Sequence, residues 1–273
     1  MKVRKKTVVF GIGAMGSALV KGWIASKMVP PSLITALDLD AAKLKKMASQ
    51  LKVKAATDAE KALKGAGLIL LAVKPQQIRE LLSQKGSEFP KRALVVSIAA
   101  GVSTEQIEKG LPQGCPVVRV MPNTPALLGA GMAAVAGGKR AKRSHIKLVL
   151  DLFSAVGRAI QVTEDQMDMV TAVSGSGPAY IFHMVEAMTE AGVKGGLSSE
   201  VAHLLVAQTV FGAARMVLEA GRTPEELRIQ VTSPGGTTQA ALAKMGEKGF
   251  KETIHAAIEA AAQRGAELRQ MSS

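Results

Sequence analysis

Residues Gly11-Ile12-Gly13-Ala14-Met15-Gly16, GIGAMG, follow the short apolar run Thr7–Phe10 and open a helical pattern, SALVKGWIA. Three glycines at this spacing between a strand and a helix are typical of a dinucleotide-binding turn. Gly11 would make the tight turn, Gly13 would let a pyrophosphate approach the backbone, and Gly16 would let the helix pack on the strand. Free amides at the helix start would bind the phosphates. The stretch predicts a Rossmann-type fold.

Outward from this turn, short apolar runs alternate with helical segments over the first 160 or so residues. Continuous runs such as LILLAV and ALVVSI are typical of strands that helices cover on both faces. We therefore expect an α/β N-terminal domain built on a doubly wound, parallel sheet. Its strands are expected at Thr7–Phe10, Ile34–Asp38, Leu68–Val73, Leu94–Ile98 and Pro116–Met121, and on weaker patterns at Met132–Ala136 and Ala159–Val162.

Several further segments end strands at the edge of the sheet where a dinucleotide binds. Asp38 closes the second strand, 22 residues after Gly16. A residue that hydrogen-bonds the adenosine ribose is expected at this position. Lys74 either neutralises a phosphate or is a solvated lysine, and the PNTP loop is either a cofactor contact or a rigid turn. The residues expected to bind the cofactor, NADPH or NADH, are Gly11, Ile12, Gly13, Ala14, Met15, Gly16, Asp38, Ala72, Val73, Lys74, Pro75, Ala99, Ala100, Asn123 and Thr124.

The chain changes character after about Glu164, where helical segments broken by Gly and Pro replace the strands. We expect residues 1–163 to form the dinucleotide-binding domain and 164–273 an all-α domain. The segment Ser198–Ala220 is apolar on nearly every side, so it must be buried on every side. About 105 residues of helix can hardly bury it alone, so we expect a second chain to cover it.

The 273 residues carry a net charge of +13, partly in the run Lys139–Arg143. Such a field attracts anions, either nucleic acid or a phosphorylated cofactor and an acidic substrate, or else the run is a solvated surface. Aromatic residues make up 3% of the chain, and no nucleic-acid-binding module accompanies the charge. We therefore expect no nucleic-acid partner.

Cysteine and histidine usage argues against disulfides and metal sites. Cys115 is the one cysteine, and the four histidines show no ligand spacing. No metal is expected, and a reducing, cytoplasmic location fits. The basic start and apolar run of MKVRKKTVVFGIGAMGSALV resemble a signal peptide, but the glycine spacing and the lack of a clear cleavage site favour the nucleotide turn. No 18 apolar residues run uninterrupted, so no membrane span is expected.

Two hydroxyl-rich breaks interrupt the helical region, SGSGPAY at Ser174–Tyr180 and TSPGGTT at Thr232–Thr238. Each exposes backbone amides where a helix begins, and such amides bind anions. Ser176 in the first break and the residues of the second are therefore candidates for binding an acidic substrate.

Six stretches occur in order along the chain: GIGAMGSAL, AVKPQ, SIAAGVS, RVMPNTP, VSGSGPAY and VTSPGGTTQAAL. Together they resemble the pyrroline-5-carboxylate reductase family, which makes proline from its cyclic imine precursor. The resemblance runs over essentially the whole chain. It implies reduction of 1-pyrroline-5-carboxylate to L-proline, the last step of proline biosynthesis, and a helical domain that interlocks with a second copy. The assembly it implies is a homodimer or a decamer of five dimers.

Carried over residue by residue, the resemblance places the substrate carboxylate at Ser233, Gly236 and Thr237. It places Thr238, the catalytic residue, at the ring nitrogen, with Glu164 and Gln230 near the substrate. Two positions depart from the family: Ala59 stands where an asparagine often touches the cofactor, and LDLD lacks the arginine that some members carry.

Two other activities fit the sequence less well. A β-hydroxyacid dehydrogenase would need a lysine base on the first helix of its second domain, but SGSGPAYIFHMVEAM has none before Lys194. A regulatory protein that binds nucleotide without turnover would have lost the substrate loop, which is intact here. The sequence therefore favours an imine reductase, in which hydride adds to the carbon of a C=N bond.

Overall fold

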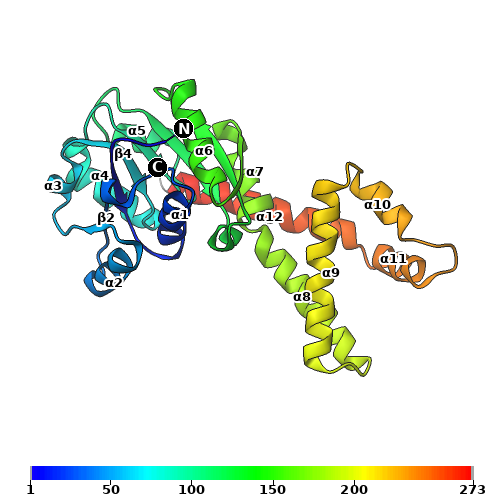
Figure 1. The fold of residues 1–273 in the computed structure, drawn as a ribbon. Helices are drawn as coiled ribbons and strands as arrows, with labels where there is room; N and C mark the ends of the chain where they lie inside the picture. Colours follow the sequence, from blue (N-terminus) through cyan, green and yellow to red (C-terminus); the bar gives the residue numbers. More distant parts are fainter. Residues whose placement is uncertain (1, 272–273) are drawn as a thin grey trace. The chain divides into compact units, whose positions relative to one another are not determined.

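The computed structural model describes residues 2–271, which form two compact units (Figure 1). The first unit comprises the chain up to Ser176 together with the stretch from Ala260 onward, and the second comprises Gly177–Glu259. The first is an α/β unit and the second is helical, as the sequence predicts.

The first unit is built on one eight-stranded sheet of order β3-β2-β1-β4-β5-β6-β7-β8. Strands β1 to β6 are parallel, β7 runs antiparallel to β6, and β8 is parallel to β7. The order 3-2-1-4-5-6 is that of the doubly wound dinucleotide-binding fold. The strands are β1 (Lys6–Phe10), β2 (Ile34–Leu37), β3 (Lys54–Ala55), β4 (Ala66–Leu71), β5 (Leu94–Ser97), β6 (Val117–Pro122), β7 (Gly131–Gly137) and β8 (Gly157–Gln161).

All seven predicted strands are present, and the predicted Rossmann-type fold is confirmed. The prediction of a wholly parallel sheet is wrong at β7, which pairs antiparallel with β6. Strand β3 escaped prediction because its two residues are exposed and form no apolar run.

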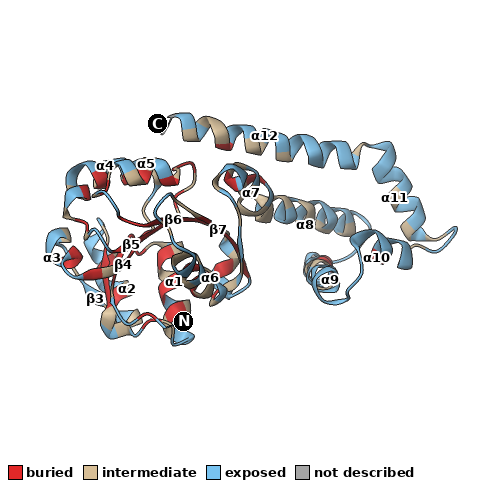
Figure 2. Cartoon of the chain, turned by 90° about the horizontal axis from the view of Figure 1, so that it is seen from above, coloured by how far each residue is buried: buried red, intermediate tan, exposed pale blue. Residues whose placement is uncertain are grey.

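Helices cover both faces of the sheet. One apolar cluster joins it to α1, α2 and α6, and includes Trp23 and Phe153. A second joins the other face to α3, α4 and α5, and includes Leu63, Ile78 and Ile107. Figure 2 shows the buried residues concentrated in and beside the strands. These helices are α1 (Ala14–Ala25), α2 (Ala41–Leu51), α3 (Ala59–Leu63), α4 (Pro75–Lys85), α5 (Thr104–Lys109) and α6 (Arg143–Ser154), with 3-10 turns η1 (Pro31–Leu33), η2 (Gly86–Glu88) and η3 (Thr124–Leu128).

Two segments beyond residue 163 also belong to the first unit. Helix α7 (Met167–Val170), after the 3-10 turn η4 (Glu164–Gln166), places the fully buried Met167 against β7. The end of α12 (Phe250–Met271) is bound there by an ion pair of 3.0 Å between Arg269 and Asp168. The division by packing therefore falls after Ser176, whereas the predicted domain boundary lies between residues 163 and 164.

The second unit consists of helices that begin or end at the predicted Gly and Pro breaks. Helices α8 and α9 pack closely, with Gly192 against Ala202. The helices are α8 (Gly177–Lys194), α9 (Ser199–Glu219), α10 (Pro224–Gln230), α11 (Thr237–Glu247) and the first part of α12. The first predicted break is not an interruption but a π-helical turn, η5 (Thr171–Gly175), which leads into α8.

Large apolar side chains remain exposed on this unit, where Figure 2 shows mostly exposed residues. In α9 only Ala202 and Val206 are buried, while Leu204 is 69% exposed. Helix α9 is also long and apolar enough to cross a membrane by length and composition alone, although the sequence contains no uninterrupted apolar run of that length. Such a surface needs a cover. The exposed set includes Ile181, Phe182, Val201, Leu204, Leu205, Phe211, Val217, Leu218, Ile229 and Val231.

We expect the double substitution Leu205→Asp and Phe211→Asp to prevent assembly of a folded oligomer. These side chains are 54% and 57% exposed in the single chain, and a carboxylate at either would have to be desolvated under a second copy. Light scattering after gel filtration should show aggregated or unfolded protein. The control is Leu128→Asp, at a leucine of η3 that is 91% exposed, and it should leave the assembly unchanged. A folded, active monomer from the double variant would contradict the expectation.

Candidate active site

The glycine-rich turn after β1 has the backbone geometry that its spacing predicts. Gly11 has φ of +92°, and a Cβ there would collide with the carbonyl of Ala72. A Cβ at Gly16 would collide with the carbonyl of Gly11, whereas one at Gly13 would meet nothing within 4 Å. Two of the three glycines are therefore required by packing. The third leaves open space beside the first amides of α1, which have no helical acceptor. This cradle fits a pyrophosphate.

Asp38, directly after β2, is tied to this turn. Its Oδ2 accepts a hydrogen bond from the amide of Ile12 at 2.8 Å, and its Oδ1 lies 2.8 Å from Nζ of Lys43. Burial tends to raise the pKa of Asp38, but the hydrogen bonds from Lys43 and from the amides of Asp40 and Ile12 outweigh it and lower the pKa below its usual value. The carboxylate is therefore ionised at neutral pH, at the position where a ribose hydroxyl would be read.

Leu39, the next residue, was not predicted as a site residue. Its side chain is 87% exposed and places an apolar surface directly after Asp38. An apolar residue directly after the acidic strand end is the one sequence signal that could have identified it.

The other predicted cofactor residues lie at the same edge of the sheet. Ala72 to Pro75 follow β4, Ala99 and Ala100 follow β5, and Asn123 and Thr124 follow β6. Lys74 is exposed and has no ion-pair partner among the described residues, so it is available to an anion. The parallel strands thus bring every predicted cofactor residue to their carboxyl ends, as the fold requires.

Asn123 is already engaged within the protein. Its Oδ1 accepts a hydrogen bond from the amide of Met132 at 2.8 Å, and its Nδ2 donates one to the carbonyl of Ser174 at 3.2 Å. The side chain therefore links the loop after β6 to the π-helical turn.

Glu164 is the counter-ion of a buried arginine. Its Oε1 lies 2.7 Å from Nη1 of Arg119 on β6, a side chain that is 1% exposed, and 3.4 Å from the amide of Thr104. Its Oε2, and Nε and Nη2 of Arg119, are buried without a hydrogen-bond partner among the described residues. A buried guanidinium requires a paired charge. Sequence reasoning placed Glu164 near the substrate but missed Arg119.

The loop Thr232–Thr238 lies in the second unit, before α11. The amide of Gly236 donates to the carbonyl of Ser233 at 3.1 Å, and a Cβ at Gly236 would collide with Oγ of Ser233. Gly236 thus leaves room for the Ser233 hydroxyl, and its own amide is occupied. As the first residues of α11, Thr237 and Thr238 carry amides without a helical acceptor. The sequence predicts that an anion binds at these amides and the neighbouring hydroxyls.

Gln230 and Ser176 complete the predicted substrate set. Oε1 of Gln230 accepts a hydrogen bond from Nη1 of Arg222 at 2.6 Å, so Gln230 is held at the end of α10. Ser176 ends the first unit, and its amide donates to the carbonyl of Thr171 at 2.8 Å. Ser176 and Glu164 therefore belong to one unit, and Gln230 and the TSPGGTT loop to the other.

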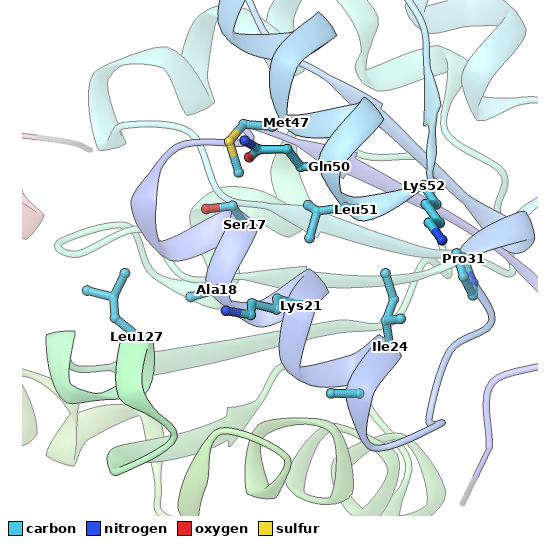
Figure 3. A pocket seen from close by; sticks show the side chains of 11 residues that line it. Ser17, Ala18, Lys21, Ile24, Pro31, Met47, Gln50, Leu51, Lys52 and Leu127 are labelled. Atoms are coloured by element: carbon cyan, nitrogen blue, oxygen red, sulfur yellow. The ribbon is translucent and has the colours of Figure 1, made fainter.

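A separate hollow of about 560 Å³ lies between α1 and α2 (Figure 3). Its lining is largely apolar and includes Ile24, Met47, Leu51 and Leu127, with lysines 21 and 52 at its surface. None of the residues predicted to bind cofactor or substrate lines it. The hollow is therefore distinct from the site assembled above.

The described residues contain no group of three or more His, Cys, Asp or Glu that could hold a metal ion. Burial raises the pKa of the Cys115 thiol to about 11, and its Sγ lies 3.2 Å from the carbonyl of Ala93. This thiol is therefore protonated and structural at neutral pH.

Two family profiles match the chain. "NADP oxidoreductase coenzyme F420-dependent" matches residues 6–101, and "Pyrroline-5-carboxylate reductase dimerisation" matches residues 164–268. The second profile covers the helices whose apolar faces are exposed in the single chain.

Curated relatives cover nearly the whole length. A pyrroline-5-carboxylate reductase of Methanosarcina acetivorans is 42% identical over 258 residues, which are 94% of this chain and 96% of the relative. The pyrroline-5-carboxylate reductase of Escherichia coli is 39% identical over 252 residues, which are 92% of this chain and 94% of the relative.

Solved structures agree with the sequences. A pyrroline-5-carboxylate reductase from Coxiella burnetii superposes with a TM-score of 0.90 at 37% identity, covering 97% of this chain and 99% of its own. The Plasmodium falciparum enzyme, solved with NADP bound, gives a TM-score of 0.87 at 29% identity, covering 98% and 100%. By sequence and by fold, this chain belongs to the pyrroline-5-carboxylate reductase family.

Proposed function

We propose that this protein reduces 1-pyrroline-5-carboxylate to L-proline with hydride from NADH or NADPH. The observation that carries the proposal is the TSPGGTT loop at the start of α11. It presents free amides and hydroxyls for a carboxylate, in a chain about 40% identical to the named reductases over nearly their whole length. The direct test follows absorbance of each reduced cofactor mixed with the protein and pyrroline-5-carboxylate. Oxidation of neither would overturn the proposal.

The first unit would bind the nicotinamide dinucleotide, which supplies the hydride. The open space at Gly13 and the amides at the start of α1 fit its pyrophosphate. Asp38 would accept hydrogen bonds from the adenosine ribose, and Leu39 would lie against the adenosine. Lys74 supplies a cation at the same edge of the sheet.

The second unit would bind the substrate. The amides of Thr237 and Thr238 and the hydroxyl of Ser233 would hold the carboxylate, and Gly236 lets the loop fold so tightly. Thr238 would donate or accept a hydrogen bond at the ring nitrogen. Its hydroxyl has no hydrogen-bond partner among the described residues and is therefore available for this role.

Positioning is the main task of these residues. A protonated imine is already electrophilic, so the protein need not supply a strong acid, and a threonine hydroxyl would be a poor one. Orientation of two reactants contributes about 7–11 kcal/mol in favourable cases. Thr238 would therefore orient the nitrogen and relay a proton, while hydride adds to the neighbouring carbon.

We further propose that a second copy of this chain, rather than a membrane, covers the exposed face of α9. Five such dimers would form a decamer, and the location would be the cytoplasm. The dimerisation profile over residues 164–268 supports the self-association. Native mass spectrometry of the purified protein tests the larger assembly, because a mass of two chains alone would exclude it.

Cofactor choice follows from Asp38 and Lys43. We expect NADH to be used well, because an ionised Asp38 accepts from a ribose 2′-hydroxyl but repels a 2′-phosphate. Asp38→Asn should improve kcat/KM with NADPH about tenfold relative to NADH, which is about 1.4 kcal/mol. Lys43→Ala should lower kcat/KM with NADPH relative to NADH, because it removes the cation that lies 2.8 Å from the Asp38 carboxylate. A wild-type efficiency with NADPH more than about tenfold above that with NADH would refute the expectation.

Damage to the TSPGGTT loop should impair substrate use and spare cofactor binding. Gly236→Val would displace the Ser233 hydroxyl and block the carboxylate, so KM should rise about tenfold or more. Thr238→Ala should lower kcat about tenfold, less than the roughly 10²-fold of a typical lost active-site donor, because a cationic imine needs little help. Thr238→Ser, which keeps the hydroxyl, is the matched control.

Steady-state kinetics in substrate and fluorescence titration of cofactor check this expectation together. Cofactor affinity should stay within about twofold of wild type in each variant, since the Gly11–Gly16 turn is untouched. Normal kinetics in both variants would show that the loop is only a turn, and the carboxylate site would then have to be sought at Ser174–Gly177.

A further inference from the structure

The π-helical turn η5 leaves one carbonyl without its usual donor. The amide of Ser176 donates to the carbonyl of Thr171, five residues back, at 2.8 Å. In an α-helix the carbonyl of Ser174 would accept from the amide four residues ahead. That residue is Pro178, which has no N–H. An unpaired carbonyl in this half-buried turn needs a donor from elsewhere in the protein.

Asn123 supplies that donor. Its Nδ2 lies 3.2 Å from the carbonyl oxygen of Ser174 and 3.5 Å from the hydroxyl oxygen of the same residue. The other end of its amide accepts from the amide of Met132 at 2.8 Å. This side chain, directly after β6, therefore bonds at once to the start of β7 and to the π-helical turn.

The turn also contacts the strand at the same point. A Cβ at Gly175 would meet Cε of Met121, the end of a flexible side chain two residues before Asn123. The turn therefore lies against the end of β6 through this methionine. The hydrogen bond from Asn123 and this contact fall on adjacent residues of the turn.

We propose that Asn123 is a positioning residue, whose amide replaces the N–H that Pro178 lacks and so fixes the turn that ends at Ser176. Ser176 is a proposed substrate residue, so loss of this bond impairs substrate use. This role differs from the direct cofactor contact that the sequence suggested for Asn123. Its kinetic consequence rests on the proposed reductase activity, whereas the hydrogen bond does not.

The experiment is a double-mutant cycle between Asn123→Ala and Pro178→Ala, in the full-length protein. Asn123→Ala should lower kcat/KM for pyrroline-5-carboxylate about tenfold. Pro178→Ala alone should change it less than about twofold, and the double variant should regain most of the loss, because the new amide at position 178 bonds to the freed carbonyl. Asn123→Asp keeps the acceptor for Met132 but lacks the donor, and it should lose activity like Asn123→Ala.

Two further measurements separate the explanations. Titration of NADH should give a dissociation constant within about twofold of wild type for every variant. Amide hydrogen exchange of residues 171–177 should be faster in Asn123→Ala and restored in the double variant, whether or not the protein reduces this substrate. A weakened NADH affinity in Asn123→Ala, wild-type behaviour of Asn123→Asp, or additive losses in the double variant would each overturn the proposal.

Discussion

The contact between Gly11 and the carbonyl of Ala72 determines where the rest of the nucleotide-binding unit lies. The amide of Gly11 donates to the carbonyl of Leu37 at 2.8 Å, and that of Ala72 donates to Phe10 at 2.7 Å. The ends of β2, β1 and β4 are thereby held in register at one point. Because no side chain fits at Gly11 or Gly16, α1 begins directly on this point. This contact also positions the free amides of α1, Asp38 directly after β2, and Lys74 after β4.

Most of the fold could be predicted because its signals are local. A strand buried on both faces needs a continuous apolar run, and runs such as LILLAV and ALVVSI show it, whereas the exposed edge strand β8 gave only a weak pattern. The cofactor edge followed from the same argument, since parallel strands bring their carboxyl ends together. Strand β3 was not predicted because Lys54 and Ala55 are exposed and form no apolar run, and they pair only with β2. Its existence depends on a partner rather than on its own composition.

The features of the site that could not be predicted are contacts between distant segments. Arg119 and Glu164 are 45 residues apart, and Asn123 and Ser174 are 51 apart. Composition shows only a charged residue in an apolar strand and an amide between two prolines. The unpaired carbonyl of Ser174 becomes apparent only in the structure, because the sequence predicts a break where the chain forms a π-helical turn. The return of the last helical residues to the first unit likewise depends on an ion pair, Arg269 with Asp168.

Charge is distributed unequally between the two units, and this bears on cofactor choice. The first unit carries 28 Lys and Arg against 13 Asp and Glu, and the second carries 7 against 9. The excess positive charge therefore lies on the nucleotide-binding unit, where it attracts NADH and NADPH alike. Salt screens that field within about 8 Å at physiological ionic strength. The field therefore raises the local concentration of both cofactors but does not distinguish a 2′-hydroxyl from a 2′-phosphate. Discrimination between the two cofactors would then have to come from a charge beside the ribose. Asp38, an acid in a basic unit, is the residue that we propose for this role, and Lys43 at 2.8 Å would moderate its repulsion of a phosphate.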